Sequence, residues 1–264
     1  MNATRDAADY YRDHGYYCHA APVLSPGEID ATLRGMERVR DGHYETGIPP
    51  EDSPWKPGND PRTLCKIEMA QQCNRAIMAA VANPRLGEVA AGITGASMIQ
   101  AWWVQLLIKP PVAPEGDFKT NVGWHQDFQY WDCWEEGSEV FTAWLALSDV
   151  TEEAGCMHFV PGSHTRGLLG QGDFYGQDLE AQSHGIRVPD GKVWSEASGA
   201  LPPGGVSFHH SLTLHASGPN RSGMPRCSLA IHLRTEKSRP KNGERKGLAE
   251  FIDDSSRCPI LFGG

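Results

Sequence analysis

The feature that most restricts the fold is a change of pattern near residue 98. Before it, apolar residues recur at helical spacing, whereas after it short apolar runs alternate with Gly, Pro, Asn and Asp turn signals. The runs that predict strands are MIQAWWVQLLIKPP, VFTAWLALSDV, CMHFVPGSH, GGVSFHH and RCSLAIHLRT. Helices followed by many short strands predict an α+β chain, mainly β in its core, built as a sandwich or barrel.

Helices are predicted at three places in the first third of the chain. TRDAADYYRDHG predicts a short helix that ends at its glycine, and NRAIMAAVANPRLGEVAAGITG a helical stretch interrupted at an Asn-Pro pair. Between them, LSPGEIDATLRGMERVRDG begins with a capping box. In that box Ser25 is the N-cap, Pro26 takes the first helical position, and Glu28 follows three residues after Ser25.

No repeat or low-complexity linker divides the sequence, so we expect a single domain over residues 1–264. Within it, residues 1–97 are expected to form a mostly helical layer with a loop. Residues 98–236 are expected to form the strand core, and residues 237–264 a polar tail that wraps the surface.

Composition excludes several classes of protein. The formal charge of −9, from 24 basic and 33 acidic residues, argues against a general binder of nucleic acids or anionic membranes. The sequence has no apolar run near the ~20 residues of a membrane span, and no apolar signal-peptide core at its N-terminus. Its seven cysteines are scattered without a C-x-x-C motif, which favours a reduced, cytoplasmic protein.

The stretch GWHQDFQYW places His125 and Asp127 two positions apart. Side chains at this spacing share one face of a strand, so an imidazole and a carboxylate there can bind one ion. Two histidines and one carboxylate leave positions open on an octahedral ion, as in non-haem Fe(II) oxygenases. The pair alone is weak evidence, because HYE at residues 43–45 shows how readily such a spacing arises. A second histidine from a distant strand is needed.

Several later histidines are candidates for that position: His158, His164, His209, His210, His215 and His232. Most histidines in strands are structural or surface residues, so spacing alone leaves the choice open. His215 is favoured because Arg226 follows it beyond a Gly-Pro-Asn turn, at the start of a returning strand. A guanidinium there can form a bidentate pair with a carboxylate bound near the metal, although a surface salt bridge is the simpler alternative.

Five ordered blocks give the chain a specific resemblance to a known family. They are YYRDHGYYCHAAPVLSPGEID, VQLLIKPP, WHQDFQYW, AWLALSDVTEEAGCMHFVPGSH and FHHSLTLHASGPNRSGMPRCSLAIHL. In this order the chain, over roughly residues 8–236, resembles the phytanoyl-CoA dioxygenase-like (PhyH) family of Fe(II)/2-oxoglutarate-dependent oxygenases. The resemblance implies a double-stranded β-helix (a cupin-like jelly roll) with N-terminal helices packed on one sheet.

The resemblance also implies a ligand set and a list of cofactors. Fe(II), 2-oxoglutarate and O2 are the implied cofactor and co-substrates. His125, Asp127 and His215 become the iron ligands, and the other histidines of the strands become structural or supporting residues.

Four further residues are implied around the co-substrate. Arg226 becomes the partner of the distal 2-oxoglutarate carboxylate, with Ser217 beside it. Trp144 lies where the phytanoyl-CoA enzyme has a tryptophan near the co-substrate, although the preceding loop is one residue longer here. Gln105 becomes an inward-facing polar contact on the strand before the ligand loop.

Substrate contacts are expected at two tryptophans. Trp131 follows the metal pair and is expected to wall the substrate pocket, with plain core packing as the alternative. Residues 42–66 carry five prolines and form a long loop, a type that is often functional. We interpret this segment as a candidate lid, in which Trp55 supplies an aromatic wall; an ordinary surface loop is the alternative.

The implied activity is the oxidation of a C–H bond of a small-molecule metabolite, with release of succinate and CO2. Asp127 favours hydroxylation, desaturation, epoxidation or rearrangement, because halogenating relatives have a small residue at that position. Two alternatives stay open: a metal enzyme on this scaffold that does not use 2-oxoglutarate, and a non-catalytic metal- or ligand-binding protein. Substrate and oligomeric state are not predicted.

Overall fold

Two antiparallel sheets form the centre of the molecule in a computed structural model that describes residues 3–112, 120–187 and 194–264. The helices are α1 (Ala3–His14), α2 (Pro26–Arg40), α3 (Arg75–Val81), α4 (Pro84–Thr94) and α5 (Leu179–Gly185). The strands are β1 (Tyr16–His19), β2 (Cys65–Glu68), β3 (Ile99–Lys109), β4 (Val122–His125), β5 (Val140–Ala146), β6 (Met157–Phe159), β7 (Ala197–Ser198), β8 (Val206–His210), β9 (His215–Ser217), β10 (Arg226–Thr235) and β11 (Ile260–Phe262). Short 3-10 helices are η1 (Ala70–Cys73), η2 (Asp127–Tyr130), η3 (Ser163–Arg166), η4 (Lys241–Gly243) and η5 (Gly247–Ala249).

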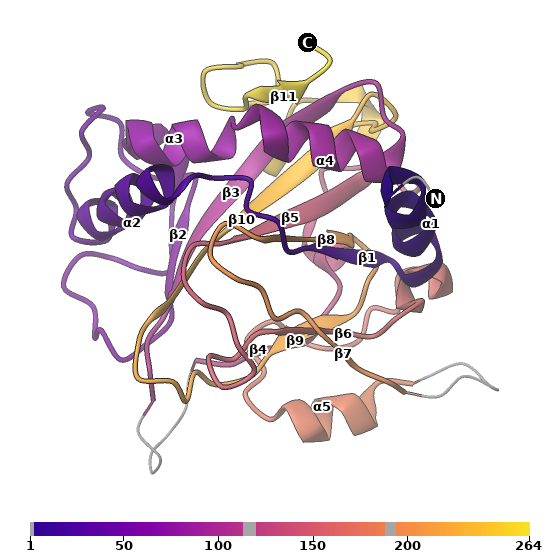
Figure 1. Cartoon of the computed structure of the whole chain (residues 1–264). Coiled ribbons are helices and arrows are strands. Elements are labelled where there is room, and N and C mark those ends of the chain that lie inside the picture. Colours follow the sequence, from indigo (N-terminus) through magenta and orange to yellow (C-terminus); the bar gives the residue numbers. More distant parts are fainter. Residues whose placement is uncertain (1–2, 113–119, 188–193) are drawn as a thin grey trace.

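The large sheet has the strand order β1-β8-β5-β10-β3-β11, with β2 also pairing with β3, and the small sheet has the order β4-β9-β6-β7. The small sheet lies opposite one face of the large sheet (Figure 1). Apolar side chains from both sheets, among them Leu107, Trp144 and Phe159, pack in one buried cluster. This arrangement confirms the predicted jelly roll.

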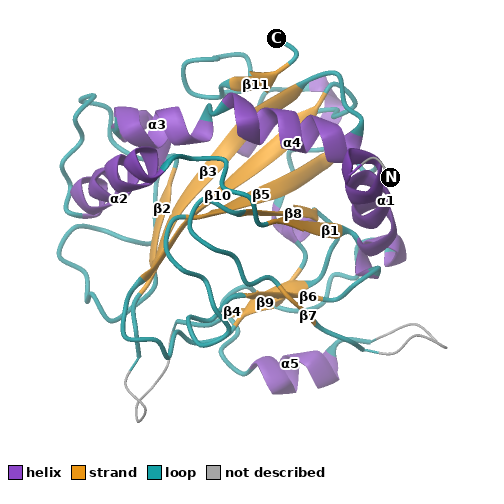
Figure 2. Ribbon diagram, in the orientation of Figure 1, coloured by secondary structure: helices purple, strands orange, loops and turns teal. Residues whose placement is uncertain are grey.

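The N-terminal helices cover the other face of the large sheet (Figure 2). Met36 of α2 and Leu86 of α4 belong to the same buried cluster as Leu106 of β3 and Ile231 of β10. The helices form there because each has one apolar stripe to bury. The predicted helical layer on one sheet is therefore confirmed.

Local capping fixes where these helices begin. The Ser25 hydroxyl accepts a hydrogen bond from the backbone N–H of Glu28, and the Glu28 carboxylate accepts one from the N–H of Ser25 at 2.7 Å. The break between α3 and α4 falls at Asn83, whose side chain caps α4. Both boundaries lie where the sequence predicts them.

The C-terminal segment differs from the predicted surface wrapping. Ala249, Ile252 and Cys258 are buried against Trp102 and Trp134. Strand β11 then extends the large sheet beside β3. Three-residue strands carry too little alternation to be predicted from sequence, and the polar residues of this segment hide its few anchors.

We predict that Ser25→Ala lowers the free energy of unfolding by about 1 kcal/mol, because the first turn of α2 loses its reciprocal cap. Urea denaturation of the purified protein measures this change. Ser25→Asp, which keeps an acceptor at the N-cap, is the control and should lose much less. Equal losses in both variants would show that the cap does not stabilise α2.

Candidate metal centre and adjoining cavities

Strand pairing brings the three candidate ligands together. His125 is the last residue of β4 and His215 the first residue of β9, and these two residues are direct partners in the antiparallel register. Asp127 is the first residue of η2, just beyond the end of β4. The expectation that His125 and Asp127 share the face of one strand is therefore wrong, because a 3-10 turn rather than the strand directs the carboxylate toward both histidines.

The three side chains point their donor atoms at one place. Nε2 of His125 lies 3.5 Å from Oδ1 of Asp127, and Nε2 of His215 lies 3.6 Å from the same oxygen. Each ring uses Nδ1 to donate to a backbone carbonyl, of Gly123 at 2.7 Å and of Thr213 at 2.9 Å. Since Nδ1 carries the proton, Nε2 has a free lone pair, and this donor set fits a divalent transition metal.

A row of residues on the large sheet holds the other oxygen of Asp127. Thr142 on β5 is the register partner of both His209 on β8 and His232 on β10. The Thr142 hydroxyl donates to Oδ2 of Asp127 at 2.6 Å, and Nε2 of His209 lies 3.2 Å from that oxygen. These contacts orient the carboxylate and leave Oδ1 facing the two histidines.

Electrostatics keep the group in the protonation state that a metal needs. Burial, with His125 and His209 close by, lowers the pKa of His215 well below its usual 6.5, so the ring is neutral. Burial by itself raises the pKa of Asp127. The surrounding histidines outweigh it and hold that pKa well below its usual value, so the carboxylate is ionised.

A narrow cavity leads from this group to a buried arginine. Arg226 is 2% exposed, and its Nη1 donates to the Gly155 carbonyl at 2.5 Å and to the Ser217 hydroxyl at 2.8 Å. Its guanidinium carbon lies 5.0 Å from the ring centre of Trp144. Gln105 lines the same cavity, so the four predicted co-substrate contacts lie together. The free volume is about 40 Å³, so an elongated diacid requires the lining side chains to shift.

Gly155 explains how the arginine is fixed. Its φ of +69° lies in the left-handed region, and an added Cβ would lie 2.5 Å from the Gly218 carbonyl oxygen. A side chain would therefore displace the Gly155 carbonyl that accepts the hydrogen bond from Arg226.

Lys109 is a second buried cation, and sequence reasoning missed it. It is the register partner of Arg226, and its Nζ donates to the Ser217 hydroxyl at 2.5 Å and to the Gly218 carbonyl at 2.6 Å. Within the described ranges, no carboxylate forms an ion pair with Lys109 or Arg226. The sequence does contain one indication of a buried Lys109: the residue ends an apolar strand and precedes two prolines.

A wider cavity of about 240 Å³ meets the metal group from another direction. It shares His125, Asp127, Phe174, Gln105 and His232 with the narrow cavity but does not reach Arg226. Its remaining lining residues are Asp52, Lys66, Glu68, Trp103, Tyr130, Trp131, Tyr175 and Leu248. Trp131 thus both packs in an aromatic cluster and borders the cavity.

Trp55 lies apart from both cavities. It is buried in the cluster beneath the helices, where its indole N–H donates to the Arg40 carbonyl at 3.1 Å. The 42–66 segment contributes Asp52 and Lys66 to the wider cavity instead. Closure of this segment over a substrate stays a prediction.

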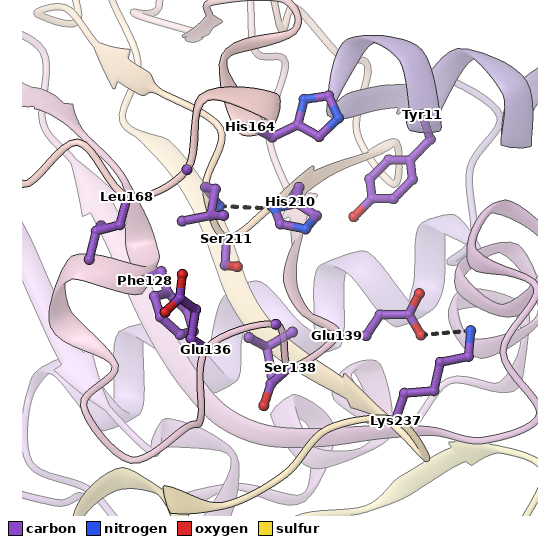
Figure 3. Close-up of a pocket in the computed structure, with 14 residues that line it drawn as sticks. Tyr11, Phe128, Glu136, Ser138, Glu139, His164, Leu168, His210, Ser211 and Lys237 are labelled. Carbon is purple, nitrogen blue, oxygen red and sulfur yellow. Dashed lines mark hydrogen bonds and ion pairs between the residues drawn. The ribbon is translucent and has the colours of Figure 1, made fainter.

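The remaining histidines divide between the centre and the periphery. His158 lies on β6, where its ring contacts the carboxylates of Glu152 and Glu196 at 2.9 and 3.4 Å. His164 and His210 line a separate cavity of about 560 Å³ together with Tyr11, Glu139 and Lys237 (Figure 3). None of the three metal-group residues borders that cavity.

A jelly roll that carries two histidines and a carboxylate at one point is the architecture of non-haem Fe(II) oxygenases. The family model for phytanoyl-CoA dioxygenase (PhyH) matches residues 11–228. The chain belongs to this family of Fe(II)/2-oxoglutarate-dependent dioxygenases.

Individual relatives are distant. A probable phytanoyl-CoA dioxygenase of Caenorhabditis elegans is 28% identical over 138 residues, which cover 52% of this chain and 43% of that protein. The match therefore spans less than half the length of that relative.

Two solved structures cover nearly the whole chain. The non-haem alpha-ketoglutarate-dependent carbocyclase SnoK from nogalamycin biosynthesis aligns with a TM-score of 0.72 and 25% identity, over 98% of this chain and 97% of that one. The epimerase SnoN, in complex with Fe3+, alpha-ketoglutarate and nogalamycin RO, aligns with a TM-score of 0.69 and 26% identity, over 96% and 90%.

We predict that Lys109 makes stability depend on alkaline pH. Burial, and then Arg226, lower its pKa well below 10.5 in the folded state. Between the folded and unfolded pKa values the unfolded chain binds more protons, so the free energy of unfolding rises with pH. Between about pH 7 and about pH 10, the free energy of unfolding of wild type should therefore rise relative to that of Lys109→Met.

Urea denaturation at both pH values measures that difference. Lys56→Met, which removes an exposed lysine, is the matched control and should show no comparable shift. A difference for Lys109→Met that is independent of pH would contradict the assignment of a depressed pKa.

Proposed function

We propose that this protein is a 2-oxoglutarate-dependent oxygenase that oxidises a C–H bond of a small molecule and releases succinate and CO2. The observation that carries the proposal is the juxtaposition of a metal-binding group with two buried cations. His125, Asp127 and His215 converge at one end of the narrow cavity, and Arg226 borders it with Lys109 behind. The first feature matches a metal ion, and the two cations match a dianionic co-substrate.

In this proposal His125, Asp127 and His215 hold Fe(II), and the backbone carbonyls behind the two rings fix their tautomers. When bound, iron and 2-oxoglutarate supply the activation of O2. The Thr142 hydroxyl holds Oδ2 of Asp127 and leaves Oδ1 facing the two histidines, where a metal would bind.

Arg226 and Lys109 would neutralise the distal carboxylate of the co-substrate. Both cations are desolvated, and burial lowers the pKa of Arg226 to about 10. A buried cation without a counter-ion is costly, so an arriving carboxylate gains more here than at the surface. The Ser217 hydroxyl, bonded to both cations, sets the spacing between them.

The wider cavity would hold the substrate. Its walls include the aromatic side chains of Trp103, Trp131 and Phe174, and a bound substrate would displace water from beside the metal group. Exclusion of water protects reactive species and strengthens polar contacts. Substrate orientation then decides which C–H bond is oxidised.

The two alternatives are less well supported. A metal enzyme on this scaffold that does not use 2-oxoglutarate leaves the buried pair of Arg226 and Lys109 without a role. A non-catalytic binding protein has no need for a donor set with open metal positions. Arg226 and Lys109 are buried and have no carboxylate partner among the described residues, which favours the oxygenase.

The proposal extends to organisation and surroundings. We treat the described parts of residues 1–264 as one catalytic domain, since a continuous cluster joins helices and sheet. No described helix is long and apolar enough to cross a membrane. A small-molecule substrate, no nucleic-acid partner and a cytoplasmic location remain predictions; the seven cysteines, all free thiols in the structure, support the last of them.

We predict that His125→Ala, Asp127→Ala and His215→Ala each weaken Fe(II) binding by more than the 10- to 100-fold typical of supporting residues, and abolish succinate release. Anaerobic equilibrium dialysis and a succinate assay measure the two effects. His43→Ala, at an exposed histidine, is the control and should change neither. Full iron binding by His215→Ala would move the ligand to His209, which also lies beside Asp127.

We predict that Arg226→Ala raises the apparent KM for 2-oxoglutarate at least ~30-fold, because loss of one partner of a buried charge pair costs about 2–5 kcal/mol. Arg226→Lys should also raise the apparent KM for 2-oxoglutarate, since an ammonium cannot form a bidentate pair with a carboxylate. Steady-state kinetics measure the constant, and iron binding should persist. Arg75→Ala, at an exposed arginine, is the control; an unchanged KM in Arg226→Ala would assign the carboxylate to another cation.

A further inference from the structure

The wider cavity contains an ion pair that the proposed chemistry does not use. Lys66 and Glu68 are two positions apart on β2, with Nζ of Lys66 3.3 Å from Oε1 of Glu68. Their side chains are 13% and 11% exposed. The intervening Ile67 packs in the core beneath the helices, so alternation directs both charges into the jelly roll beside the metal group.

Glu68 is held as a fixed acceptor. The indole N–H of Trp103 donates to Oε2 at 2.6 Å, and Nε2 of Gln105, its register partner, lies 3.4 Å from Oε1. A carboxylate with these donors keeps its position when a ligand enters, and its remaining lone pairs can accept further bonds.

The Lys66 ammonium uses less of its hydrogen-bonding capacity than the Glu68 carboxylate does. The ammonium lies 4.3 Å from the centre of the Phe174 ring, and Glu68 is its ion-pair partner among the described residues. Phe174 in turn lies 5.1 Å from the His125 ring, between centres. An ammonium has three donors, so Lys66 has capacity for an anionic or acceptor group placed next to the metal.

We propose that the substrate is a compact zwitterion, an amino acid, whose carboxylate binds Lys66 and whose ammonium binds Glu68. This inference rests on the proposed oxygenase function. A ligand with only one charge would bring a like charge close to Lys66 or Glu68, whereas one with both charges satisfies the pair. The aromatic walls favour a cation, and a volume of about 240 Å³ fits a small metabolite rather than a long acyl chain.

The first experiment measures succinate release, with Fe(II) and 2-oxoglutarate present, for each of the common amino acids in L- and D-forms. Matched probes are the amine without the carboxylate, the acid without the ammonium, and palmitoyl-CoA. We expect at least one amino acid to stimulate succinate release, and each single-charge analogue to do so at least ~10-fold less well. Stimulation by palmitoyl-CoA, or by no amino acid, would overturn the assignment.

Two variants test the roles of Lys66 and Glu68. Each should change which single-charge analogue binds better, an effect that misfolding cannot produce. Glu68→Gln should raise the KM of the amino acid at least ~10-fold and make the acid analogue the better ligand. Lys66→Met should do the reverse and favour the amine analogue. Glu88→Gln and Lys237→Met, both at exposed positions away from the wider cavity, are the matched controls. Unaltered preference in both cavity variants would sink the proposal.

Iron content and 2-oxoglutarate affinity are measured in the same preparations. A wild-type protein that binds iron and 2-oxoglutarate but shows no amino-acid response disproves the substrate assignment alone. A wild-type protein that binds neither disproves the proposed function itself.

Discussion

The pairing of β4 with β9 is the interaction on which the candidate site depends. It places His125 opposite His215, although ninety positions of sequence separate them. The tautomer of each ring follows from the same backbone, because each Nδ1 donates to the carbonyl two residues earlier. Backbone geometry, rather than side-chain contact alone, thus creates the two lone pairs that converge with Asp127.

The large sheet supports this group from behind by regular alternation. His209, Thr142 and His232 form one row across three strands, and all three point inward beneath Asp127. Arg226 and Lys109 form a second paired position further along the same face. Because Thr142, Arg226 and Lys109 lie on strands of the large sheet, the backbone that supports the carboxylate and the two cations is held in place by strand pairing.

Much of this arrangement could be predicted from the sequence. The H-x-D spacing and the Arg226 that follows His215 beyond a turn favoured these residues, and the resemblance to the phytanoyl-CoA dioxygenase-like family selected them from the other histidines. Lys66 and Glu68 could not be found, because β2 has four residues and lies at the end of a segment that resembles a loop. Trp55 was misplaced because its burial depends on the Arg40 carbonyl, a contact that only the tertiary structure reveals.

The two cavities differ in charge, and under the proposed function this difference separates the chemistry from substrate specificity. The narrow cavity presents cations without a described counter-ion, on central strands that also carry the supports of the metal group. The wider cavity presents both signs of charge, on β2 and the segments around η2. Since β2 contacts the rest of the sheet through β3 alone, its inward residues can change with little effect on the metal group. Under the proposed function, substrate choice can therefore vary through the wider cavity while the narrow cavity keeps the oxidative chemistry.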